Sequence, residues 1–117
     1  MVNNQKPVTA EVRKLVHHIV DTMLDYNSTP TRQEFTGNKP TFHVGLSGHT
    51  GSIDVFCNPN GYGDVWEKKQ CGESLVRLCE NEYTTEDKIK DNLCRVLFEM
   101  ECIYHEWYTK QEAEPNV

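Results

Sequence analysis

The sequence contains no apolar run of the roughly 18 residues that a membrane-spanning helix needs. Its first residues, MVNNQKPVTAEV, lack the basic-then-apolar layout of a signal peptide, so we expect a cytoplasmic protein without a membrane partner. At 117 residues the chain has the length of one domain. We expect that domain to span 1–117, with frayed polar tails at 1–7 and 111–117 and a long loop at 27–40.

Cysteine pairs at metal-binding or redox spacing are also missing. The five cysteines form an odd number and contain no C-x-x-C pair. This spacing suits neither a disulfide framework nor a zinc knuckle. We therefore expect reduced thiols that are mostly buried as small apolar groups. The cysteines are Cys57, Cys71, Cys79, Cys94 and Cys102.

No catalytic fingerprint is present. The chain has no nucleophile elbow, P-loop, H-E-x-x-H or dinucleotide-binding motif, so we expect a protein that is not an enzyme and needs no cofactor or metal. His43, His49 and Asp54 could together hold a metal ion, and this keeps a small metal- or histidine-dependent enzyme as a third alternative. The candidate acid–base groups are His43, His49, Asp54, Asp64 and His105.

A basic stripe, the usual mark of a nucleic-acid-binding surface, is absent as well. Residues 1–70 hold seven acidic and seven basic side chains, whereas residues 71–117 hold eleven acidic and five basic ones, so the net charge of −6 lies in 71–117. This distribution argues against direct nucleic-acid binding. The acidic part is either a solvated surface that keeps the protein soluble or a docking surface for a basic partner, on which it would mimic nucleic-acid charge.

The most informative stretch lies between Pro40 and Trp66. Its apolar residues alternate along two segments, which is the period of half-buried strands. A Pro-Asn-Gly turn follows the second segment. This pattern predicts an antiparallel three-stranded meander over 41–69.

Two long helices are predicted beside the meander. Thr9 is a suitable N-cap for a helix over 9–26, and Thr84 or Thr85 begins a second over 85–110, with Glu86 and Asp87 in its first turn. A short helix near Ser74–Asn81 should connect the third strand to the second long helix. The expected fold is a two-layer α+β domain of order α-β-β-β-α-α. Its expected core residues are Phe42, Val44, Leu46, Ile53, Val55, Leu15, Ile19, Met23, Leu93, Val96, Met100 and Ile103.

The first turn of the meander carries more polar chemistry than a turn requires. Its backbone N–H groups and hydroxyls could converge on an anion, with aromatic rings of the same meander beside them. The alternative is a tight hairpin in which the two glycines only satisfy the backbone. The candidate ligand-binding residues are Ser47, Gly48, His49, Thr50, Gly51, Ser52, Asp54, Tyr62 and Trp66.

The second long helix has an apolar seam and a second apolar line beside it, which ends in Tyr104, Trp107 and Tyr108. This is more aromatic surface than one small sheet is expected to cover, so we expect a homodimer or higher homo-oligomer formed through these three residues. The alternative is a single wide core face that needs no partner.

The meander also resembles that of small early-region accessory proteins of bacteriophages and prophages. The residues that carry the resemblance are Phe42, Val44, Ser47, Gly48, His49, Gly51, Asp54, Val55, Gly61 and Tyr62. The resemblance implies a phage protein that acts in an infected bacterium by stoichiometric binding. It would sequester a nucleotide-derived immune signal or, alternatively, inhibit a host defence protein in the manner of an anti-CRISPR. In the second case its acidic C-terminal half would occupy a basic nucleic-acid-binding surface.

Overall fold

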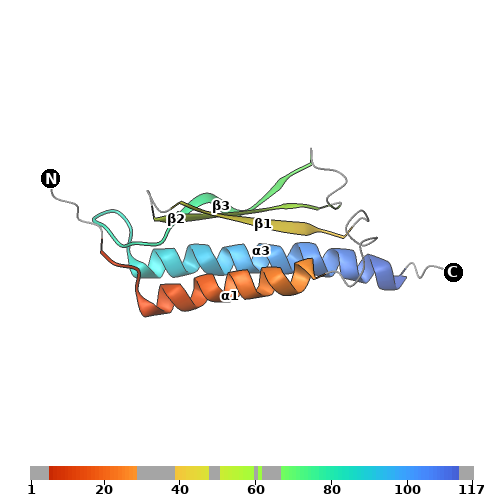
Figure 1. Ribbon diagram of the computed structural model, residues 1–117, viewed down its shortest axis with the longest axis horizontal. Coiled ribbons are helices and arrows are strands. Elements are labelled where there is room, and N and C mark those ends of the chain that lie inside the picture. The colour runs from red at the N-terminus through yellow and green to blue at the C-terminus, as the bar shows by residue number, and fades with distance from the viewer. Residues whose placement is uncertain (1–5, 29–38, 48–50, 60, 62–66, 114–117) are drawn as a thin grey trace.

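The computed structural model describes residues 6–28, 39–47, 51–59, 61 and 67–113. Within them the element order is α1 (Ala10–Asn27), β1 (Thr41–Ser47), β2 (Ser52–Asn58), β3 (Lys69–Arg77) and α3 (Glu86–Ala113). The strands form one antiparallel sheet in the order β1-β2-β3, and the two helices cover one of its faces (Figure 1). The predicted α+β class and the meander are thus confirmed.

Both helices begin at hydroxyl caps. Oγ1 of Thr9 accepts the N–H of Val12 at 3.3 Å, and Oγ1 of Thr85 accepts the N–H of Lys88 at 3.3 Å. Such a bond satisfies one of the N–H groups that the first turn of a helix leaves without a partner. α1 agrees with its predicted bounds to within one residue, and α3 extends three residues beyond its predicted end.

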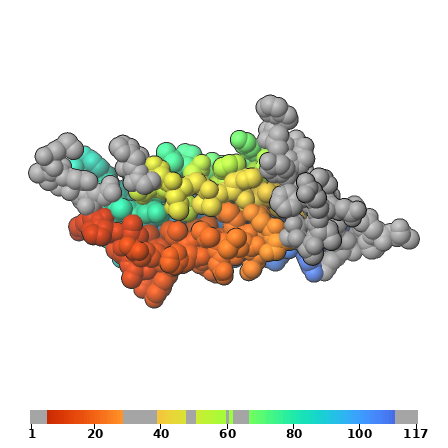
Figure 2. All heavy atoms as spheres, in the orientation of Figure 1, coloured from red at the N-terminus to blue at the C-terminus, as the bar shows by residue number. Residues whose placement is uncertain are grey.

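The helices lie side by side and run in the same direction, so that both begin at the same end of the molecule (Figure 1). Near the other end the rings of Tyr26 and Tyr104 stack, with centroids 4.0 Å apart and planes 7° apart. β1 lies directly against α1 on the face shown in Figure 2. Asn27 at the end of α1 holds the strand there: its Nδ2 donates to the carbonyl of Phe42 at 2.8 Å, and the N–H of Phe42 donates to its Oδ1 at 2.9 Å.

The third strand and the segment after it differ from expectation. β3 begins at Lys69, where the predicted meander ended, and residues 74–77 belong to this strand. Residues 78–85 contain no helix, so the predicted short helix over Ser74–Asn81 is wrong. Ile53 pairs with Val76 but Val55 pairs with Cys71, and the residues between Cys71 and Val76 therefore bulge out of the ladder. The bulge breaks the two-residue alternation, and the apolar residues around it fall by chance at helical spacing.

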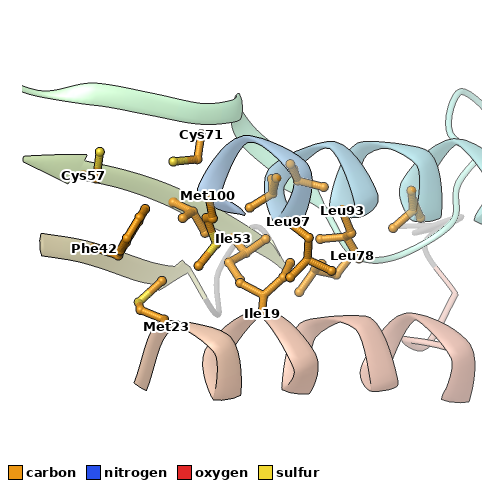
Figure 3. Close-up of a cluster of buried hydrophobic side chains, with 14 of the residues drawn as sticks. Ile19, Met23, Phe42, Ile53, Cys57, Cys71, Leu78, Leu93, Leu97 and Met100 are labelled. Carbon is orange, nitrogen blue, oxygen red and sulfur yellow. The ribbon is translucent and has the colours of Figure 1, made fainter. Parts of the chain in front are cut away.

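The core lies between the sheet and the helices (Figure 3). Most of the predicted core residues are buried there, and Leu15 is partly buried. Val44 and Leu46 are exceptions, with 37% and 64% of their surface exposed. They face the helix side, opposite the buried Val55 and Ile53, but β1 is an edge strand and these two side chains remain exposed there. Their assignment to the core is therefore wrong.

Candidate binding surface on the outer sheet face

The predicted ligand-binding turn is described only in part. Gly48, His49, Thr50, Tyr62 and Trp66 lie outside the described residues. Ser47 and Ser52 pair with each other at the end of the β1–β2 hairpin, and Gly51 has a positive φ of 61°. The carbonyl of Gly51 accepts the N–H of Leu78 at 2.8 Å. This part of the turn therefore has the backbone role that the hairpin interpretation assigns to it.

The structure places the remaining candidate residues on separate elements. His43 and Asp54 lie on β1 and β2, and His105 is exposed on α3. His49 and Asp64 are not among the described residues. Among the residues that the structure describes, no group of three or more His, Cys, Asp or Glu side chains could hold a metal ion.

The sheet face that points away from the helices carries a stacked pair of rings. His43 and Phe56 are opposite each other in the β1–β2 register, with centroids 4.9 Å apart and planes 19° apart. Nζ of Lys68 lies 5.3 Å from the centroid of the Phe56 ring, within the range of a cation–π contact. Both rings are half-buried and Lys68 is exposed, so the group is accessible at the protein surface.

An amide behind the stack fixes the imidazole. Nδ2 of Asn58 donates to the carbonyl of Glu67 at 3.1 Å, so Oδ1 of Asn58 faces His43, whose Nε2 lies 2.6 Å away. Because Oδ1 can only accept, Nε2 of His43 must carry the proton in this contact. Asn58 is buried, with 2% of its surface exposed, so the imidazole is held by a rigid partner.

Polar groups flank the stack along β3. Gln70 is paired with Phe56, and its Nε2 donates to Oδ1 of Asp54 at 2.6 Å and to the carbonyl of Val55 at 2.8 Å. The outer face therefore combines a flat aromatic surface, a cation beside it, and an amide and a carboxylate about one strand away. We call His43, Phe56, Lys68, Gln70 and Asp54 the outer-face cluster.

Sequence reasoning named two members of this cluster, His43 and Asp54, and missed Phe56, Lys68 and Gln70. The sequence pattern did indicate the position of Phe56. Val55 and Cys57 belong to the apolar alternation of the second strand and point inward, so the residue between them must point outward. An outward aromatic residue in the central strand of a sheet that is covered on one face indicates either an exposed binding surface or a second covering layer.

The thiols divide into two groups. Cys57, Cys71 and Cys79 are buried, as the composition predicted, whereas Cys94 and Cys102 are exposed on α3. A hydrogen bond to Cys57, together with burial, raises the pKa of the Cys71 thiol. The same hydrogen bond lowers the pKa of Cys57. The two buried thiols thus interact with each other, and Cys71 remains a thiol at neutral pH.

The three residues of the predicted oligomer interface differ in exposure. Tyr104 is partly buried against the core and stacks on Tyr26 within the same chain. Trp107 is half-buried, and Lys39 lies over its ring at 5.9 Å. Tyr108 has 48% of its surface exposed. Part of the aromatic surface is thus used inside the monomer.

Comparison with known proteins finds no match, since no family model, no curated protein and no solved structure resembles this chain. In the described part of the chain, no helix is both long and apolar enough to cross a membrane.

Proposed function

We propose that this chain is a non-catalytic binding protein of phage type, which counteracts a bacterial defence system by sequestering a nucleotide-derived immune signal. The observation that carries the proposal is the stack of His43 on Phe56 with Lys68 beside it, exposed on the outer face of the sheet. Aromatic side chains on open sheet faces offer platforms on which nucleobases stack, at about 1–3 kcal/mol per base.

Each part of the outer-face cluster matches one part of a nucleotide. A base would extend the stack that His43 forms with Phe56, and the ammonium group of Lys68 would neutralise a phosphate. The amide group of Gln70 is already used by Asp54 and Val55, and the carboxylate of Asp54 can accept from a base edge or a ribose hydroxyl. This surface is distinct from the Ser47–Ser52 turn, which remains a second contact for the same ligand.

The ligand is expected to be small. The cluster contains one lysine and one carboxylate, Asp54, and the net charge of the chain is −6. A long nucleic acid carries a charge at every nucleotide and would be repelled by the acidic remainder of the molecule. A cyclic nucleotide or an ADP-ribose derivative places only one or a few phosphates near Lys68.

Calorimetry with a panel of cyclic nucleotides and ADP-ribose derivatives tests the proposal. We expect one of them to bind, Phe56→Ala to weaken binding at least about tenfold through the lost stacking, and Lys68→Ala to weaken it most at low salt. Tyr83→Ala is the matched control, because Tyr83 is 79% exposed and lies outside the cluster. Absence of binding across the panel would overturn the proposal, and conversion of the bound ligand would show an enzyme instead.

A second candidate function rests on the acidic surface of α3, where Asp87, Asp91, Glu101 and Glu106 are exposed. In this version the C-terminal half blocks the basic nucleic-acid-binding groove of a host defence protein, as an anti-CRISPR inhibitor would. It predicts that the chain competes with nucleic acid for a purified defence nuclease, and that salt weakens the competition. Competition that Phe56→Ala leaves intact would favour this version over sequestration.

A further inference from the structure

The side of α3 that points away from the core carries a row of residues spaced by four. Phe98 lies about 160° around the helix from the fully buried Met100, so the middle of this row faces solvent. Each step of four residues turns about 40° around the axis, so the two ends of the row lie on opposite flanks of the exposed side. Cys94 and Cys102 are exposed, and Phe98 has 64% of its surface exposed. The row begins and ends with side chains of opposite charge. We call it the outer ridge of α3; its residues are Lys90, Cys94, Phe98, Cys102 and Glu106.

The outer ridge of one copy is complementary in charge to the outer ridge of a second copy that runs in the opposite direction. Read from residue 90 the row is Lys-Cys-Phe-Cys-Glu, and read from residue 106 it is Glu-Cys-Phe-Cys-Lys. Rows of residues spaced by four interdigitate in the commonest class of helix packing. We propose that two copies of this chain associate through antiparallel α3 helices, with the two Phe98 rings at the dyad and Lys90 of each copy opposite Glu106 of the other.

The charges on the outer ridge favour a second copy of this chain as the partner, packed in the antiparallel orientation. A parallel pair would place Lys90 beside the partner's Lys90 and Glu106 beside the partner's Glu106. Antiparallel packing replaces both repulsions with attractions and gives the isologous contact that a two-fold dimer requires. In the described part of α3, Glu106 pairs with the exposed Lys110 at 3.5 Å and Lys90 with Asp87 at 4.0 Å, so both side chains can reorient toward a neighbour at small cost.

The two thiols of the ridge meet across this interface. Cys94 and Cys102 each lie four residues from Phe98, about 6 Å along the helix axis on opposite sides of the dyad. Cys94 is therefore level with the partner's Cys102. With helix axes about 10 Å apart, Cα atoms that lie about 40° to the side of the line between the axes are about 6.5 Å apart, which lies within the range of a disulfide. Inside one chain the same two cysteines are eight residues apart, about 12 Å, and cannot be joined.

The interface without disulfides is expected to be weak. Two exposed aromatic residues and two ion pairs per dimer fall short of the roughly 1,600 Å² of a standard interface. Oxidation joins the two copies covalently through disulfide bonds. The Cys94 thiolate attacks a disulfide oxidant such as oxidised glutathione and releases one glutathione thiolate, and the partner's Cys102 thiolate then displaces the second. Two protein thiols are thereby oxidised while one glutathione disulfide is reduced to two thiols.

Non-reducing electrophoresis after incubation with oxidised glutathione tests the proposal. Wild-type protein should form a covalent dimer, whereas Cys94→Ser alone and Cys102→Ser alone should each remain monomeric, because identical positions lie about 12 Å apart along the axis. An equimolar mixture of the two variants should form the covalent dimer again, through the single remaining Cys94–Cys102 pair. A parallel or random association predicts that each single variant still cross-links to itself.

Phe98→Glu tests the centre of the interface. It places two carboxylates at the dyad and should reduce the rate of cross-linking at least about tenfold. Leu75→Glu is the matched control, since Leu75 on β3 is 60% exposed and lies outside the ridge. Glu106→Lys should also slow cross-linking, and Lys90→Glu combined with Glu106→Lys should restore it by exchanging the charges.

The fold and the thiols are checked separately. Circular dichroism should show unchanged helix content in every variant, because all of the altered side chains are exposed or half-exposed. A thiol reagent should modify Cys94 and Cys102 readily in the reduced protein. Wild-type protein whose thiols react rapidly but do not cross-link, or single variants that cross-link as well as their mixture, would overturn the proposal.

Discussion

Replacing Gly72 with alanine should destabilise the protein more than its position in an outer strand suggests. Gly72 has a φ of +72°, a conformation that costs an L-residue about 1–2 kcal/mol. A Cβ atom there would lie 2.5 Å from Cγ2 of Val96, and overpacking of that kind costs about 1–3 kcal/mol. Its N–H also donates to Oε2 of Glu99 at 2.6 Å, so the backbone cannot move away from α3 without losing this bond. The expected total is about 2–5 kcal/mol of the 5–15 kcal/mol typical of such domains.

Urea denaturation followed by circular dichroism at 222 nm measures this loss. Gly45→Ala is the matched control, because a Cβ at Gly45 meets nothing within 4 Å and alanine in a strand is at least as favourable as glycine. In the Gly72→Ala background, Val96→Ala should cost about 1 kcal/mol less than it does alone, since it removes the clashing methyl group. A Gly72→Ala protein within about 0.5 kcal/mol of wild type, or strict additivity of the two changes, would refute the reasoning.

Two further predictions concern the end of α1. Asn27→Ala removes both hydrogen bonds to the backbone of Phe42 and should cost about 1–3 kcal/mol, seen as faster hydrogen exchange at the Phe42 amide than at that of Val55; equal acceleration at both amides would contradict it. Burial and then the charge of Glu101 raise the pKa of the Tyr26 phenol above 10.0, so folding favours its protonated form. The resulting stability is complete below the unfolded pKa of about 10 and is lost as pH rises through the folded pKa. Tyr26→Phe should therefore show a smaller fall in melting temperature between about pH 9 and 11 than wild type, and parallel falls would exclude this role.

The regular elements could be predicted from the sequence because their signals are local. Thr9 and Thr85 cap their helices through bonds to residues three positions on, and alternation placed β1 and β2. β3 could not be placed in the same way. Gly72 and its neighbours leave the ladder to meet Val96 and Glu99 of α3, and the sequence carries no local sign of a partner that lies more than twenty residues away.

The candidate surface could be predicted only in part, for a related reason. Alternation tells which face of a strand a residue occupies, but it does not tell what covers that face. Val44 and Leu46 were placed on the correct face and are nevertheless exposed, because they lie on an edge strand that the described helices do not cover at this point. Phe56 was passed over because it lies on the opposite face, where its significance depends on His43 and Lys68 from two other segments.

The parallel arrangement of α1 and α3 has a consequence for how the chain must be made. The apolar stripe of α1, with Val12, Ile19 and Met23, completes its burial only against a helix that begins at residue 86. Ribosomes add about 5–20 residues per second, so the stripe would wait about 4–16 s between the synthesis of Tyr26 and that of Tyr104, its stacking partner. During this interval α1 has only the sheet to pack on, and β1 is the strand that contacts it. The nascent chain is thus a natural client for chaperones, and a product truncated before α3 should be degraded instead of accumulating as a stable fragment.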